Sequence, residues 1–170
     1  MPIVEAILME MENEAKVTQR VLERIPEDKL SWRPHPKSFS LGQLAMHIAE
    51  AQGWLSEVLQ KDVHQINIAP PPEPKNHKEI LEAFERGQSL AKANLGKLDD
   101  AKLMGTWTAE INGKTVLSLP RIAVVRSIVL NHIYHHRGQL SVYLRMLNVA
   151  VPSIYGPSAD ENPFVATAAA

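Results

Sequence analysis

The most constraining feature of this chain is a long stretch of helical periodicity, residues 119–148, which carries His132, His135 and His136. Because a helix advances roughly 100° per residue, His132 and His136 lie about 40° apart on one face. That face is apolar and is centred on His136, whereas His135 points about 60° to the other side. Imidazoles in a helix core need partners for their nitrogens, and a shared metal ion is one way to supply them.

A third candidate ligand comes from another predicted helix, residues 41–59, for which Ser38 and Ser40 offer N-cap oxygens. His47 lies on the apolar face of that helix, about 20° from Trp54, and so points inward. A histidine on an apolar face is more often satisfied by a carbonyl or a carboxylate. The residues alone therefore leave a structural role open beside the metal-binding role.

The remaining apolar periodicity indicates a single helical domain. Apolar residues recur at three- and four-residue spacing in four segments. These segments are 2–25, 41–59, 77–95 and 119–148. The predicted fold class is all-α, a four-helix bundle with a small β-hairpin before the last long helix. We expect one domain over residues 1–165 and a frayed tail over 166–170.

The hairpin is predicted where the pattern changes to strict alternation, in residues 106–118. Asn112 and Gly113 supply the two-residue turn that tight hairpins favour. An isolated hairpin is marginal in water, so we expect it to pack on the helices through Trp107 or Leu117. Gly138, inside the last helix, suggests a close approach of another helix at that position.

Composition limits the classes of function. The chain has 170 residues, 45% of them hydrophobic, a formal net charge of −1 and no cysteine. The balanced charge argues against nucleic-acid and membrane partners, since neither would find a strong basic field. The lack of cysteine excludes disulfides, thiolate ligands and a cysteine nucleophile, so a metal would be held by histidine, carboxylate or water. With no leader or spanning segment in the pattern, we expect a cytoplasmic protein.

The motif His-x-x-x-His-Arg-Gly-Gln at residues 132–139 points to a known family. It is preceded by Trp32-Arg33-Pro34 and followed by the segment 154–161. Together these resemble the DinB-like (damage-inducible, YfiT-type) metalloprotein family over roughly residues 3–161. The resemblance implies an up-down-down-up bundle, often dimeric, with a divalent metal held by three histidines. By position these are His47, His132 and His136, the same three that the helical faces indicate.

The resemblance also implies an activity. Characterised branches of the family look like thiol S-transferases and isomerases that use bacillithiol or mycothiol, and many other members are labelled metal-dependent hydrolases. We therefore expect a metal-dependent enzyme for a small-molecule substrate, either a thiol-dependent transferase or a hydrolase. Zinc and nickel are the first candidates for the ion, with iron, copper and manganese also compatible. The thiol would be a low-molecular-weight cosubstrate, and no organic-cofactor site is expected.

Two alternatives stay open at this point. The first is a non-enzymatic bundle that binds a metal or a small ligand, as a sensor or stress-response protein. The second is a damage-response protein that acts on nucleic acid, which the charge balance disfavours.

Two further expectations concern the surroundings of the site. A catalytic ion needs a cavity, which the connection 32–39 and the tail 155–160 would wall, and Tyr155 is then the candidate proton donor or substrate contact. The competing interpretation of Tyr155 is a packing residue that pins the tail. We also expect a homodimer, because Trp54, Trp107 and the apolar helix edges exceed what one bundle of this length buries. His64 and His77, at the ends of the proline-rich spacer, are expected at the surface.

Overall fold

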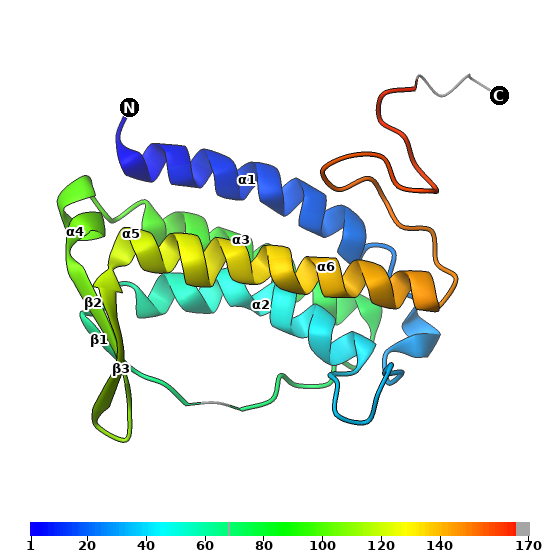
Figure 1. The fold of residues 1–170 in the computed structure, drawn as a ribbon, viewed down its shortest axis with the longest axis horizontal. Helices are drawn as coiled ribbons and strands as arrows, with labels where there is room; N and C mark the ends of the chain where they lie inside the picture. Colours follow the sequence, from blue (N-terminus) through cyan, green and yellow to red (C-terminus); the bar gives the residue numbers. More distant parts are fainter. Residues whose placement is uncertain (68, 166–170) are drawn as a thin grey trace.

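Four long helices make up the body of the protein (Figure 1): α1 (Ile3–Leu22), α2 (Leu41–Val58), α3 (His77–Leu95) and α6 (Asn131–Met146). The computed structural model describes residues 1–67 and 69–165. α2 packs most extensively on α3, and α6 contacts both α2 and α1, while α1 also contacts α3. Figure 1 shows α1 and α6 running in one direction and α2 and α3 in the opposite one. The shorter helical segments are the 3₁₀ turn η1 (Glu27–Lys29), α4 (Asp100–Met104), α5 (Arg121–Val124) and the π-helical η2 (Val125–Leu130).

The helix boundaries agree with the sequence pattern because local signals set them. The Ser40 hydroxyl accepts a hydrogen bond from the backbone N–H of Gln43 at 3.0 Å, and the Gln43 side chain accepts one from the N–H of Ser40 at 3.1 Å. This reciprocal cap begins α2. The predicted frayed tail, residues 166–170, lies outside the described residues, and the domain limit at residue 165 stays a prediction.

The predicted hairpin is present, but the sheet has three strands, so the all-α prediction has to be corrected to mostly helical with a small sheet. β2 (Thr106–Ile111) pairs antiparallel with β3 (Lys114–Pro120). Asn112 and Gly113 between them have φ angles of 51° and 73°, as a tight hairpin turn requires. β1 (Val63–Gln65) adds to the other edge of β2 in parallel. A three-residue edge strand shows too little alternation to be read from sequence.

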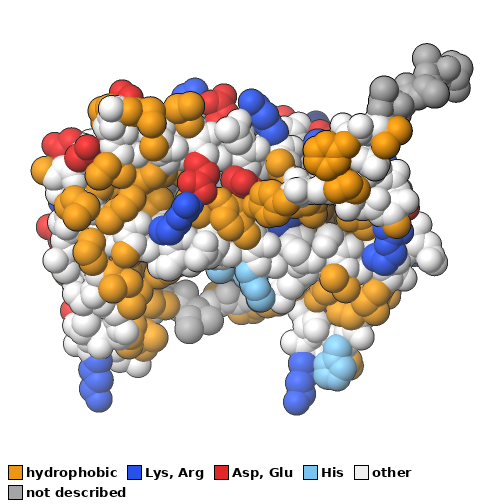
Figure 2. Space-filling view, turned by 45° about the horizontal axis from the view of Figure 1, so that its top comes forward, with side chains coloured by type: hydrophobic (Ala, Val, Ile, Leu, Met, Phe, Trp, Pro, Cys, Tyr) orange, Lys and Arg blue, Asp and Glu red, His pale blue; other side chains and the backbone are white. Residues whose placement is uncertain are grey.

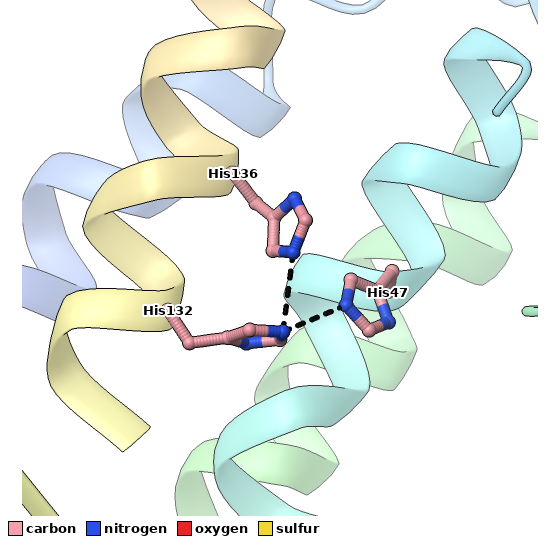
Figure 3. A group of neighbouring side chains, drawn as sticks. All are labelled: His47, His132 and His136. Atoms are coloured by element: carbon pink, nitrogen blue, oxygen red, sulfur yellow. Dashed lines mark hydrogen bonds between the residues drawn. The ribbon is translucent and has the colours of Figure 1, made fainter. Parts of the chain in front are cut away.

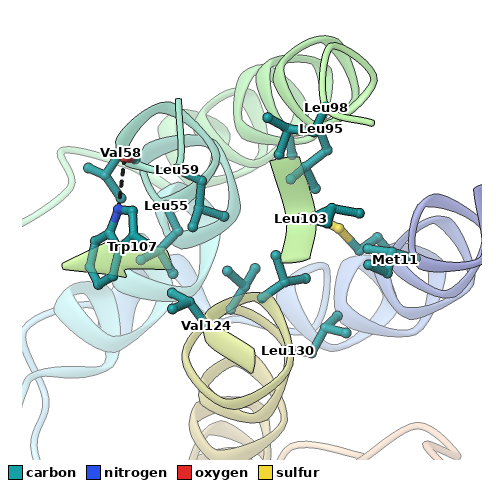
Figure 4. Packing of buried hydrophobic residues seen from close by; sticks show 14 of the residues in the cluster. Met11, Leu55, Val58, Leu59, Leu95, Leu98, Leu103, Trp107, Val124 and Leu130 are labelled. Carbon is teal, nitrogen blue, oxygen red and sulfur yellow. Dashed lines mark hydrogen bonds between the residues drawn. The ribbon is translucent and has the colours of Figure 1, made fainter. Parts of the chain in front are cut away.

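The sheet covers one end of the helical bundle (Figure 1). It packs on the helices through the side chain of Trp107, as predicted. Trp107 is 4% exposed, and its indole N–H donates to the backbone carbonyl of Val58 at 3.2 Å (Figure 4). Leu117 packs against the same apolar cluster. This cluster joins the sheet to α1, α2, α3 and the start of the last helical run, so the hairpin is stabilised by the helices.

The close helix approach is at Gly87 and not at the predicted Gly138. A Cβ added at Gly138 would have nothing within 4 Å, so that prediction was wrong. At Gly87, on α3, an added Cβ would lie 2.6 Å from the carbonyl oxygen of Ala49 on α2. One added at Gly53, on α2, would lie 2.9 Å from the Cα of Gly87. The absence of side chains at these two glycines lets the backbones of α2 and α3 touch.

These two positions give opposite expectations for the same substitution. Gly87→Ala should lower the free energy of unfolding by about 1–3 kcal/mol, because the methyl group meets backbone that cannot move aside. Gly138→Ala should raise it by up to about 1 kcal/mol, because alanine is the better helix former and the space is open. Urea denaturation of the two variants beside the parent chain measures both. If Gly87→Ala raised the free energy of unfolding as Gly138→Ala is expected to do, the close contact of α2 and α3 at Gly87 would be contradicted.

Candidate metal centre

Three histidine side chains from two helices point toward one another (Figure 3). His47 comes from α2, and His132 and His136 come from successive turns of α6. The Nε2 atom of His132 lies 3.0 Å from Nε2 of His47 and 3.1 Å from Nε2 of His136. All three side chains are half-buried, and one nitrogen from each lies within 4.8 Å of the other two. The structure thus brings together the three residues that the sequence singled out.

The spacing of the three nitrogens fits a shared metal ion. A tetrahedral ion with metal–nitrogen distances of about 2.0–2.1 Å places neighbouring nitrogens about 3.3 Å apart, close to the observed separations. The Nδ1 atom of His136 faces the side-chain oxygen of Gln139 at 2.7 Å. In the tautomer whose Nδ1–H donates to this oxygen, the lone pair of His136 is on Nε2 and directed at the other two rings. This donor set could hold a divalent ion.

The histidines are also kept in the protonation state that metal binding needs. Burial, and then the neighbouring His136, lowers the pKa of His47 to about 4. Burial lowers the pKa of His132 to about 4 as well, with smaller contributions from His136, His47 and His135. Burial is likewise the main cause that lowers the pKa of His136. At neutral pH all three imidazoles are uncharged and available as ligands.

The lowered pKa values predict how stability depends on pH. For His47 and His132 the folded value, about 4, lies below the ordinary 6.5 of an unfolded chain, so between these limits the unfolded state binds more protons. The free energy of unfolding of metal-free protein should therefore be highest above pH 6.5 and fall as the pH drops toward 4. Urea denaturation at pH 7 and pH 5 tests this. The double variant His47→Gln/His132→Gln should show a shallower pH dependence, and an unchanged one would contradict the assignment.

A π-helical turn immediately precedes the two histidines of α6. The six residues Val125–Leu130 form η2, which continues from α5 and leads into α6. A π-helical turn carries an extra residue, which rotates the following helix by roughly 100° relative to the preceding one, and such turns are frequent at functional sites. The apolar periodicity predicts an unbroken α-helix over residues 119–148, so this turn is a correction to that prediction. The turn sets how His132 and His136 are oriented relative to the buried residues of α5 and η2.

Histidine side chains gather in a recess of the molecular surface (Figure 2). Figure 2 shows histidine side chains at its floor and projecting parts of the chain on either side. Phe39, at the end of the connection 32–39, packs on His47 with ring centroids 5.8 Å apart, so this connection contacts one of the three histidines. That it walls a cavity together with the tail stays a prediction. His135 is exposed and lies outside the group of three.

Tyr155, the predicted proton donor, is held by residues of α1 and α6. Its hydroxyl donates to a carboxylate oxygen of Glu14 at 2.8 Å. The guanidinium of Arg137 donates to the same hydroxyl and lies 5.0 Å from the centroid of the Tyr155 ring. Among the described residues, no hydrogen bond or ring contact joins Tyr155 to the three histidines. These contacts favour the packing role, and the catalytic role stays a prediction.

Two histidines that were expected at the surface are half-buried with specific partners. A ring nitrogen of His77 lies 2.8 Å from the carbonyl oxygen of Leu22. His64, on β1, lies between the rings of Trp54 and Trp107. Both were placed wrongly because their neighbours in sequence are polar, whereas the groups that cover them come from other segments.

The fold and the site together define a mostly helical protein with a small sheet and a three-histidine group suited to a divalent metal. The sequence profile of the DinB family matches residues 3–163. An uncharacterised protein of Bacillus subtilis (strain 168), YrdA, is 25% identical over 158 residues, which cover 91% of this chain and 89% of YrdA. This chain therefore belongs to the DinB family, and the predicted resemblance is confirmed.

Solved structures of DinB-like proteins have the same fold. One from Bacillus cereus ATCC 10987 matches with a TM-score of 0.71 at 24% identity, over 89% of this chain and 97% of that one. Another, YjoA from Bacillus subtilis, matches with a TM-score of 0.66 at 21% identity, over 84% and 92% of the two chains. In the part of the chain that the structure describes, none of the helices has the length and apolar character needed to cross a membrane. The cytoplasmic location stays a prediction.

Proposed function

We propose that this protein is a metal-dependent enzyme in which His47, His132 and His136 hold one divalent ion for chemistry on a small molecule. The observation that carries the proposal is the convergence of three neutral, half-buried imidazole nitrogens within 4.8 Å of one another. Structural sites in proteins usually close the coordination shell with four protein ligands, whereas three ligands leave a position for water or substrate. This arrangement supports a catalytic role over a structural one.

The chemistry that suits the site is thiol transfer or hydrolysis. A divalent ion held there would lower the pKa of a water or thiol that reaches it and polarise an electrophilic substrate. Because the chain has no cysteine, a thiol nucleophile would have to come from a low-molecular-weight cosubstrate. In the transfer reaction the thiol sulfur would bond to the substrate's electrophilic carbon, while the leaving group departs with the thiol proton.

The first experiment identifies the ion and then the activity. Zinc and nickel are the metals we propose first, with iron, copper and manganese as the others that imidazole and water ligands accept. Metal analysis of purified native protein should find one ion per chain. The metal-loaded protein is then assayed for conjugation of small thiols to electrophiles and for hydrolysis of esters and amides. Chelation should abolish turnover, and restored metal should recover it.

A specific outcome would favour the non-enzymatic alternative. If no reaction is catalysed with zinc, nickel, iron or manganese bound, while a small ligand still binds at the ion, the protein is a metal and ligand-binding bundle.

Tyr155→Phe tests whether the tail contributes to chemistry. Because the hydroxyl is held between Glu14 and Arg137, we expect turnover within about twofold of the parent and a small loss of stability, of the order of one hydrogen bond, about 1 kcal/mol. The measurement is turnover at full metal loading, together with urea denaturation. A large loss of turnover with unchanged metal content and stability would instead assign Tyr155 the role of proton donor.

We also propose that the chain forms a homodimer of up-down-down-up four-helix bundles. The structure changes the basis of this proposal, because Trp107 is buried within one chain. Support comes instead from the groove between α1 and α3, which has a volume of about 290 Å³. Met9, which lines it, is 59% exposed, and Leu90, on the adjoining part of α3, is 44% exposed. Light scattering at tens of micromolar protein should give twice the mass of the chain, and a monomer mass would contradict the proposal.

A further inference from the structure

Trp54 is the one aromatic side chain that shares the face of α2 with His47. The two are seven residues apart, so they differ by about 20° around the helix and by about 10.5 Å along it. The side chain of Trp54 lies on the apolar stripe of α2 and is 49% exposed. A large half-exposed aromatic side chain keeps apolar surface in contact with water, so covering it with an apolar group is favourable.

Trp54 is held in place by two further rings. The ring of His64 meets that of Trp54 edge-on, with centroids 5.6 Å apart and planes at 75°. On its other side, His64 is nearly parallel to Trp107, with centroids 6.3 Å apart and planes at 20°. Trp107 is itself anchored by its hydrogen bond to Val58. The three rings form a ladder from the core to the surface, and Trp54 is its exposed end.

The ladder carries no formal charge at neutral pH. Burial, and then the nearby Lys61, lowers the pKa of His64, so its imidazole is uncharged. The Nε2 atom of His64 is buried and has no hydrogen-bond partner among the described residues. A neutral aromatic surface of this kind attracts another flat or apolar group.

We propose that Trp54, backed by His64 and Trp107, forms an apolar subsite that binds an aromatic or other flat apolar group of the small molecule whose polar end reaches His47, His132 and His136. This inference rests on the proposed function and adds a substrate class to it. The substrate has a metal-binding or electrophilic end and an uncharged apolar arm that extends about 10 Å from it.

A small molecule suits this surface better than a second copy of the chain does. His47 and Trp54 share one face of α2. Figure 2 shows histidine side chains in a recess between two projecting parts of the chain. A flat protein surface would meet the projections first. A six-carbon chain that ends in a phenyl ring spans about the distance from His47 to Trp54 along α2 when it is extended.

The test uses two hydroxamates, because this group binds divalent metals through its two oxygens. Acetohydroxamate carries no arm, and 6-phenylhexanohydroxamate carries a phenyl ring on a chain of suitable length. Isothermal titration calorimetry of the zinc-loaded protein should show the phenyl compound binding at least about tenfold more tightly, as burial of one aromatic ring predicts. Binding of the phenyl compound should also change tryptophan fluorescence.

In Trp54→Ala the phenyl compound should lose this advantage and bind within about twofold of acetohydroxamate, whose own affinity should not change. Leu90→Ala, which removes another half-exposed apolar side chain on a different helix, is the matched control and should retain the full advantage. Circular dichroism and metal content confirm that both variants are folded and loaded. A tenfold advantage that persists in Trp54→Ala would overturn the subsite. Failure of acetohydroxamate itself to bind the parent chain would instead refute the open metal position on which the subsite depends.

Discussion

His132→Ala is expected to reduce affinity for divalent metal more than any other single change in this chain. The Nε2 atom of His132 lies within 3.1 Å of the corresponding atoms of both other histidines, so its loss removes the ligand between them. Loss of a hydrogen-bond partner to a metal ligand typically costs about 10- to 100-fold in affinity, and loss of the ligand itself should exceed the upper figure. Competition with a chromophoric chelator measures the dissociation constants of the variants.

Two neighbouring variants calibrate this result. Gln139→Leu removes the partner that orients His136 and should weaken binding by about 10- to 100-fold. His135→Ala removes an exposed histidine outside the group of three and should change the affinity by less than about twofold. If His135→Ala weakened binding as much as His136→Ala does, our assignment of the helix face would be wrong. Unchanged affinity in His47→Ala would remove α2 from the site.

Arg137→Met is expected to cause the largest loss of stability at a single polar residue near the site. Arg137 is 1% exposed, and its guanidinium pairs with the Glu14 carboxylate at 2.7 Å. It also donates to the backbone oxygen of Glu14 at 3.2 Å and to the hydroxyl of Thr18 at 3.1 Å. The rings of Tyr134 and Tyr155 lie on it, with centroids 5.5 Å and 5.0 Å away.

Removing this guanidinium leaves the largely buried Glu14 carboxylate without its counter-charge. We expect the free energy of unfolding to fall by about 3–5 kcal/mol, the usual cost of breaking a buried pair from one side. The tail that contains Tyr155 should also loosen, which limited proteolysis would detect. Arg145→Ala, which breaks the exposed pair with Asp160, is the control and should cost no more than about 1 kcal/mol. Similar losses in the two variants would show that the Glu14–Arg137 pair adds nothing beyond a surface ion pair.

The two sets of variants distinguish the residues that bind the metal from the residues that stabilise the fold around it. Arg137 follows His136 directly and packs against α1, whereas His136 points to α2. One turn of α6 therefore presents a ligand on one side and a stabilising ion pair on the other. We expect Arg137→Met to retain metal binding under conditions where the chain stays folded, and His132→Ala to retain stability while losing metal.

Local interactions explain what could be predicted from the sequence alone. The limits of α2 and α3, the cap at Ser40 and the turn at Asn112 and Gly113 depend on residues within a few positions of one another. The facing of His132 and His136 follows from the pitch of one helix. His47 could be added because an apolar stripe fixes which side of its helix points inward.

The tertiary structure decided whatever depends on pairing between distant segments. β1 becomes a strand only because the edge of β2 is open to it. α2 and α3 touch at Gly87, rather than any helix at Gly138, because the choice of packing partner is not encoded in one helix. Tyr155 lies on Arg137 because the tail folds back over α1 and α6. Periodicity shows which side of an element is buried, but the partner on that side is chosen by packing of the whole chain, which also left Trp54 exposed and Trp107 covered.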